Sequence, residues 1–163
     1  GTSNRQILHT ESIMARAQTT RRSKILAALA EQFKAIDGTG NYKSDLGNNV
    51  SSRMQFWDEI DQFPAVHMAA GSETREYYGG GNKWRFLTIT IRCYVNDSND
   101  VILALEELLE DVETVIEDND PLTYTDSTGA SQSTAQTTIL TVDTDEGVLE
   151  PLGVGEIAIE VRY

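Results

Sequence analysis

The stretch that decides the fold is KWRFLTITIRCYVNDSNDVILALEELLEDVETVIEDND, residues 83–120. In its first part apolar residues alternate with other residues, which is the period of a β-strand with one face in a core. The row predicted to face the core is Leu87, Ile89, Ile91, Cys93 and Val95. The opposite row is Trp84, Phe86, Thr88, Thr90, Arg92 and Tyr94. The alternation therefore predicts one long strand over 84–95.

The second part of this stretch has the spacing of an amphipathic helix. Turn and cap residues occupy 96–100, and apolar residues then recur every three or four positions. The apolar stripe comprises Val101, Leu105, Leu108, Val112 and Val115, seconded by Ile102, Leu109 and Ile116. A strand that leads into such a helix predicts a helix packed on a sheet, with the other strands gathered around this strand.

The segments before this unit predict a helix, an arm and a turn. A short amphipathic helix is expected from Thr20 to the Asp37-Gly38 boundary, with glycine ending it. Its apolar residues are Ile25, Leu26, Leu29, Phe33 and Ile36. Residues 41–54 are rich in Gly, Asn and Ser and predict an extended arm or loose hairpin, outside the core, of the kind that commonly reaches another subunit. Residues 55–62 predict one short helical turn.

The remaining segments complete an α+β fold. Residues 79–82 predict a turn that joins two antiparallel strands, and residues 126–136 predict a polar, mobile loop. The predicted strands cover 64–70, 75–78, 84–95, 137–144 and 155–163. We therefore expect a mostly antiparallel twisted β-sheet with two amphipathic helices packed on it, an extended arm and mobile loops.

The length of the chain fits one domain. With 163 residues, of which 39% are hydrophobic, we expect a single α+β domain at 20–163. Residues 1–19 are polar and patternless and predict a flexible segment, in which residues 1–13 precede a native start at Met14. Cys93 lies in the apolar row and predicts a buried, reduced thiol. No apolar run approaches the roughly 20 residues that cross a bilayer, so we expect a soluble protein made in a cytoplasm.

The charge of the chain is strongly negative and uneven. The net charge is −13, with +4 on residues 1–34 and −17 on the other residues. Residues 97–120 contain ten acidic residues and no Lys or Arg. This acidic face either keeps the protein in solution, or repels nucleic acid and meets a basic partner such as the N-terminal segment of a neighbouring copy. Sequence-specific DNA binding is disfavoured, because phosphate contacts need a positive surface.

The sequence offers no catalytic, cofactor-binding or metal-binding constellation. His67 lies mid-strand and His9 lies in the N-terminal segment, so no pair of histidines is available for a metal or a proton relay. The acidic turns at 97–100 and 143–147 lack the spacing of a calcium-binding loop. The glycines at 79–81 lack the lysine and the following helix of a phosphate loop. We predict that the protein is not an enzyme.

Several stretches resemble the tail terminator proteins of long-tailed, siphovirus-like bacteriophages. They are RSKILAALA at 22–30, FPAV at 63–66, the aromatic strand at 84–92, the helix at 103–112 and the ending at 145–163. The resemblance covers 20–163. It implies two helices on a twisted sheet, and a structural virion protein that forms a six-membered ring. This ring caps the growing tail tube, ends its polymerisation and offers the surface to which the DNA-filled head attaches.

The resemblance also implies the partners and the place of the protein. The partners are further copies of the chain, the tail tube protein, a head-completion or neck protein, and DNA that passes through the ring without sequence-specific binding. The place is the head-proximal end of the virion tail, after assembly in the host cytoplasm, with no membrane. Two rival functions stay open: a head-completion, neck or other tail component, and a small α+β enzyme, which requires a pocket with converging polar groups.

Two sets of residues are candidates for assembly. Exposed arginines and aromatic residues contribute disproportionately to interfaces, although Trp57 and Trp84 also fit a core. The interface candidates are Arg21, Arg22, Lys24, Tyr42, Trp57, Tyr78 and Trp84. The candidates for an acidic lumen or interface are Glu106, Glu107, Glu110, Asp111, Glu113 and Glu117. An acidic wall lets DNA pass because it does not hold phosphates.

Overall fold

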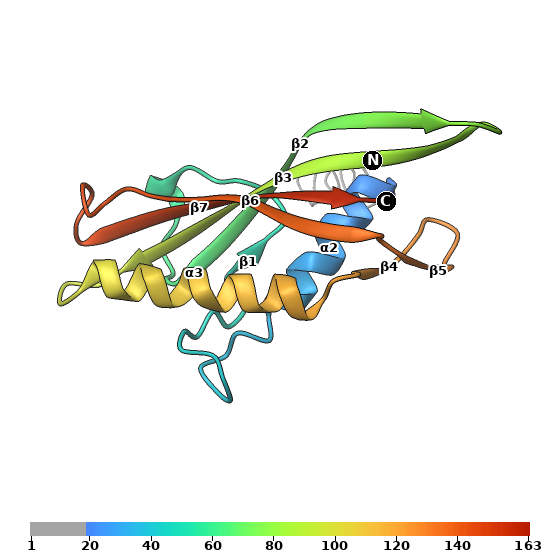
Figure 1. The fold of residues 1–163 in the computed structure, drawn as a ribbon. Helices are drawn as coiled ribbons and strands as arrows, with labels where there is room; N and C mark the ends of the chain where they lie inside the picture. Colours follow the sequence, from blue (N-terminus) through green and yellow to red (C-terminus); the bar gives the residue numbers. More distant parts are fainter. Residues whose placement is uncertain (1–18) are drawn as a thin grey trace, which may run out of the picture.

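A five-stranded sheet with two helices packed on one face forms the body of the molecule (Figure 1). The computed structural model describes residues 19–163. The helices are α2 (Arg21–Phe33) and α3 (Val101–Asp118), and η1 (Trp57–Glu59) is a 3-10 turn. In sheet order, the strands are β1 (Val50–Ser51), β2 (Ala65–Tyr78), β3 (Asn82–Asn96), β7 (Leu152–Arg162) and β6 (Gln136–Thr144). Only β1 and β2 run parallel, so the predicted α+β fold is confirmed.

Strand β3 is the centre of the sheet, as the alternation in the sequence predicts. It pairs with β2 on one side and with β7 on the other, antiparallel in both cases. The inward row of Leu87, Ile89, Ile91 and Cys93 is fully buried. In the outward row Thr88 and Thr90 are half-buried and Arg92 is exposed. One face of the sheet therefore carries the core, and within residues 19–163 no α-helix lies on the other face (Figure 1).

Helix α3 lies along the covered face, opposite β3 and β7. The Asp100 carboxylate caps it by accepting a hydrogen bond of 3.1 Å from the backbone N–H of Leu103. The predicted stripe is buried, with the exception of Ile102, which is 54% exposed. Ile102 follows Val101 by about 100° around the helix, so it turns away from the sheet at the first turn. On the sheet side, Gly153 and Gly155 of β7 leave room for α3.

Helix α2 is shorter than predicted. Thr20 and Ser23 form a capping box at its start, and the helix ends at Phe33 instead of the Asp37-Gly38 boundary. Ile36 is still fully buried, but it lies beyond the helix and its carbonyl accepts a hydrogen bond of 2.8 Å from Leu46 N–H. The apolar spacing continued past the helix because the following turn also faces the core.

The predicted arm at 41–54 is folded onto the body of the chain, so the expectation that it lies outside the core is wrong. Leu46 is fully buried in the hydrophobic core. Val50 and Ser51 form β1, which pairs with the start of β2. The Gly and Asn residues of this segment lie in turns that return the chain, and Leu46 anchors the segment in the core.

The predicted hairpin and C-terminal strands are present. The two strands predicted at 64–70 and 75–78 are one strand, β2, with an irregularity between Ala70 and Glu73. The glycine turn then leads into β3, as predicted. Strand β6 forms one edge of the sheet, and its pairing with β7 is interrupted by a bulge between Ile139 and Thr141.

The predicted loop at 126–136 includes β5 (Ser131–Ser133), which pairs with β4 (Thr123–Thr125) just before it, so the prediction of a loop without regular structure is wrong. The Asp126 carboxylate holds the turn by accepting hydrogen bonds from Thr128 Oγ1 at 2.6 Å, Gln132 Nε2 at 3.0 Å and Ala130 N–H at 3.0 Å. These bonds lower the pKa of Asp126 to about 2. This segment is held by polar contacts, so it could not be predicted from the pattern of hydrophobic residues.

The predictions for Met14, for His9 and for residues 1–18 as a flexible segment lie outside the described residues. In residues 19–163 no helix is long and apolar enough to cross a membrane.

Candidate assembly surfaces

The hairpin of β2 and β3 projects beyond the rest of the sheet, and Figure 1 shows it leaving the body at the upper right. The outer pairs, such as Tyr77 with Lys83 and Tyr78 with Asn82, have no β7 residue beside them. We call residues 74–84 the hairpin tip. Its aromatic residues are accessible: Tyr77 is 68% exposed, Tyr78 is 49% exposed and Trp84 is 37% exposed.

Trp84 is held in place by two neighbours. The guanidinium carbon of Arg162 lies 4.8 Å from the Trp84 ring centroid, and the Tyr78 ring lies 6.3 Å from it. Stacking of this kind limits the rotamers of large side chains, so less freedom is lost when a partner covers them. The predicted candidates Tyr78 and Trp84 therefore come together as one aromatic surface.

A polar network fixes the base of the hairpin. The Glu73 side chain is 6% exposed, it accepts a hydrogen bond from the Tyr163 hydroxyl, and Arg75 Nη2 lies 3.0 Å from it. Burial raises the pKa of the Glu73 carboxyl, but the hydrogen bonds from Tyr163 and Arg75 outweigh burial and leave this pKa below its usual range. Burial and the bond to Glu73 raise the pKa of Tyr163.

Tyr163→Phe is expected to lower the free energy of unfolding by about 1 kcal/mol at neutral pH, because Glu73 loses a donor in a nearly buried place. The folded-state pKa of Glu73 is lowered, so its stabilisation is present above the unfolded pKa of about 4 and is lost as the pH falls through the folded pKa. The difference between variant and parent should therefore shrink in acid. Urea denaturation of variant and parent, at neutral pH and again in acid, measures this difference in the free energy of unfolding. Tyr78→Phe, at an exposed hydroxyl, is the control, and an equal loss in both variants would contradict the assignment.

The basic start of α2 is used within the chain. Arg21 Nη2 donates a hydrogen bond of 3.1 Å to the Tyr124 hydroxyl, and its guanidinium carbon lies 4.9 Å from the Tyr163 ring centroid. Arg22 donates a hydrogen bond to the Gly71 carbonyl of β2. These charges tie α2 to the base of the hairpin and to β4, which explains their unfavourable place at a helix N-terminus.

A hollow of about 400 Å³ lies at the opposite end of the sheet from the hairpin tip. Its apolar lining includes Phe56 from the segment before η1, Tyr94 from β3, Leu149 from the connection before β7, and Val154 of β7. Acidic residues of the β6 end and of β7 surround it, together with one arginine: Asp143, Asp145, Glu156 and Arg92. We call this feature the sheet-end hollow. Sequence reasoning missed it, because its lining comes from separate segments.

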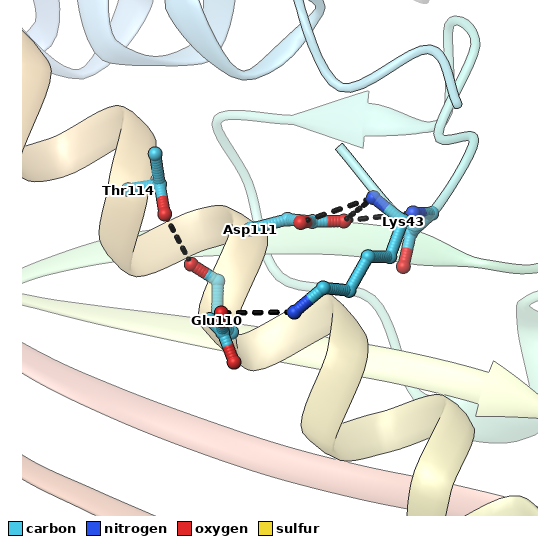
Figure 2. Close-up of polar contacts among 5 residues, drawn as sticks. Lys43, Glu110, Asp111 and Thr114 are labelled. Atoms are coloured by element: carbon cyan, nitrogen blue, oxygen red, sulfur yellow. Dashed lines mark hydrogen bonds and ion pairs between the residues drawn. The ribbon is translucent and has the colours of Figure 1, made fainter. Parts of the chain in front are cut away.

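Helix α3 carries an acidic face, but Asp111 is not part of it. Figure 2 shows the Asp111 carboxylate pointing at the segment before Leu46, where it accepts hydrogen bonds from the backbone N–H groups of Lys43 at 2.9 Å and Ser44 at 2.7 Å. Asp111 is 2% exposed, which contradicts its expected place on a lumen or interface surface. Lys43 Nζ also lies 2.9 Å from Glu110 Oε1 (Figure 2).

The other five acidic candidates of α3 are accessible to different degrees. Glu106, Glu110 and Glu117 are exposed, whereas Glu107 and Glu113 are half-buried. Burial and the nearby charges of Glu117, Glu110 and Glu106 raise the pKa of Glu113. We call these five residues the acidic face: Glu106, Glu107, Glu110, Glu113 and Glu117.

Comparison with known proteins identifies the family. The family model described as Bacteriophage Tail Tube Terminator Protein matches residues 19–163. This chain belongs to that family. It is also 36% identical, over 150 residues, to the tail tube terminator protein p142 of Escherichia phage T5, covering 87% of this chain and 92% of p142. The sequence-based assignment to the tail terminators is confirmed.

A solved structure shares the fold of this terminator family member. A chain of the virion of a native gene transfer agent particle superposes with a TM-score of 0.53, over 86% of this chain and 95% of that chain. Its sequence identity is 9%, so the similarity concerns the fold. The terminator family consists of structural tail proteins and is not an enzyme family.

The remaining predicted residues of this terminator are dispersed. Lys24 is half-buried on α2, and Tyr42 packs against the core. Trp57 opens η1, where a helical turn was predicted. Their roles in an interface stay predictions.

The groups considered for chemistry are placed as in a structural protein. Cys93 is fully buried, and burial raises the pKa of its thiol. His67 is 5% exposed, and its Nδ1 accepts a hydrogen bond of 3.3 Å from Gln55 N–H. Burial lowers the pKa of His67, which favours the neutral ring. Within residues 19–163 no group of three or more His, Cys, Asp or Glu side chains is arranged to hold a metal.

Proposed function

We propose that this chain forms a closed ring of six copies that caps the tail tube at its head-proximal end. Residues 20–163 act as one domain, and the ring ends polymerisation of the tube and offers a surface to a head-completion or neck protein. The observation that carries the proposal is the 36% identity to the tail tube terminator protein p142 of phage T5, across 87% of this chain and 92% of p142. Assembly takes place in the host cytoplasm.

The two ends of the sheet differ from each other, and this difference supports a ring. A closed ring of identical copies uses a heterologous interface, in which two different patches of each copy meet. The hairpin tip projects from one end of the sheet (Figure 1), whereas the lining residues of the sheet-end hollow come from the other ends of β3, β6 and β7. Each copy thus presents one patch to the copy before it and another to the copy after it.

We further propose that the acidic face of α3 lines the channel through which DNA passes. No Lys or Arg lies between 97 and 120, and Lys43, which reaches this face, is paired with Glu110 at 2.9 Å, so the face stays strongly negative and holds phosphates poorly. The same repulsion explains how a ring can surround DNA without retaining it.

The experiment that tests the proposed function is capping of tubes made from the purified tail tube protein. Tubes grown with this chain should stop at shorter lengths in electron micrographs, carry a ring at one end and fail to extend when more tube protein is added. Light scattering of the ring should give about six times the chain mass of 18.0 kDa. An unrelated acidic protein is the control. Unchanged tube growth, with binding to isolated heads instead, would indicate a neck component.

A further inference from the structure

We propose that the hairpin tip of one copy docks into the sheet-end hollow of the next copy. The inference rests on the proposed function, because the occupant is a second copy of this chain in a ring. It goes further by naming the two surfaces that meet: the aromatic residues of the tip, and the apolar lining and acidic surroundings of the hollow.

The shapes of the two features favour this pairing. The tip is a two-stranded projection (Figure 1). The hollow is a recess lined by residues from the far ends of β3, β6 and β7. A volume of about 400 Å³ lies within the range of about 300–1,000 Å³ that is usual for recesses that enclose a ligand. It accommodates aromatic side chains of the size of Tyr77 and Tyr78.

Both features also expose apolar surface that a partner would cover. Phe56 at the hollow is 75% exposed and Leu149 is 41% exposed, while Tyr77 at the tip is 68% exposed. Buried aromatic anchors surrounded by polar groups are the usual centre of a protein interface. The tip supplies the anchors and the hollow supplies the recess.

The charges of the two features are complementary. Residues 74–84 contain Arg75 and Lys83 against Glu76, but Arg75 is already paired with Glu73 at 3.0 Å, so Lys83 is the cation that the tip offers to a partner. Around the hollow, Arg92 is paired with Glu156 at 3.1 Å, which leaves the carboxylates of Asp143 and Asp145 in excess. Lys83 at the tip and the carboxylates in excess at the hollow would attract each other in such an encounter.

The decisive experiment uses paired cysteines. In the Tyr78→Cys, Leu149→Cys double variant, mild oxidation of the assembled ring should produce a ladder of covalent oligomers up to six chains on a non-reducing gel. In an equimolar mixture of the two single variants, oxidation should give covalent dimers and no longer oligomers. Each chain then carries only one introduced cysteine and can be linked to only one neighbour. Covalent dimers from Tyr78→Cys alone would show a tip-to-tip contact and overturn the inference.

A second measurement covers the case in which the cysteines lie at a poor angle. The Tyr77→Ser, Tyr78→Ser variant should raise the protein concentration at which the ring half-dissociates by about tenfold or more. Leu140→Ser, at a residue of β6 that is 48% exposed, is the matched control and should leave this concentration unchanged. Far-ultraviolet circular dichroism confirms that each variant is folded.

The failure of the inference differs from the failure of the proposed function. If parent and Tyr77→Ser, Tyr78→Ser rings dissociate alike and no ladder forms on rings bound to tubes, the docking inference is wrong while capping stands. If the parent protein neither forms rings nor caps tubes, the proposed function fails.

Discussion

Asp111→Ala is expected to lower the free energy of unfolding by about 3 kcal/mol. The carboxylate accepts backbone hydrogen bonds of 2.9 Å from Lys43 and 2.7 Å from Ser44, in a place where it is itself 2% exposed. Alanine leaves both N–H groups without this acceptor and releases the segment that places Leu46 in the core. Urea denaturation with linear extrapolation measures the loss.

Glu110→Ala is the matched control for this prediction. Glu110 is the preceding residue of α3 and its partner, Lys43, is the same, but its ion pair at 2.9 Å is exposed. Exposed ion pairs contribute about 0–1 kcal/mol, so this variant should stay close to the parent. Asp111→Asn keeps one acceptor oxygen and should fall between the two. If Asp111→Ala and Glu110→Ala lose the same amount, the segment is held by something other than Asp111.

Gly153→Ala is expected to destabilise the fold by about 2 kcal/mol through overpacking. A Cβ at this position of β7 would lie 2.8 Å from Val101 Cγ2 and 2.8 Å from Val95 Cγ2. Both neighbours are buried and β-branched, so neither side chain yields without moving α3 or β3. The midpoint of thermal unfolding should fall accordingly.

Gly79→Ala is the control for Gly153→Ala. At Gly79, in the turn of the hairpin, a Cβ would meet no atom within 4 Å. The substitution should be neutral or slightly stabilising, because alanine reduces the freedom of the unfolded chain. If both variants lose stability equally, the cost of Gly153→Ala comes from the backbone and not from the contact with α3.

Much of the fold follows from hydrophobic periodicity. The alternation in β3 and the stripe of α3 predict both elements, because burial of one face requires that spacing. The segments that were mispredicted depend on single residues. Leu46 places the expected arm in the core, and Asp126 orders the expected mobile loop through hydrogen bonds. Hydrophobicity averaged over a stretch of sequence does not reveal the effect of a single leucine or a single carboxylate.

The candidate surfaces were predictable in part. Tyr78 and Trp84 could be selected by residue type, and the structure puts them side by side. Asp111 could not be told from its acidic neighbours by composition, although it lies three residues after Leu108 and four before Val115, on the side of the buried stripe. The sheet-end hollow exists only after Phe56, Tyr94 and Leu149 have been brought together by folding.

The bulge in β6 bears on how this chain avoids aggregation. An unpaired strand at the edge of a sheet is a template to which further chains can add indefinitely. Strand β6 exposes Leu140 and Val142, which would strengthen such addition. The bulge between Ile139 and Thr141 bends the edge and disrupts its regular pattern of donors and acceptors. The bulge thereby hinders edge-to-edge addition of further copies, which would otherwise give an open polymer of this chain.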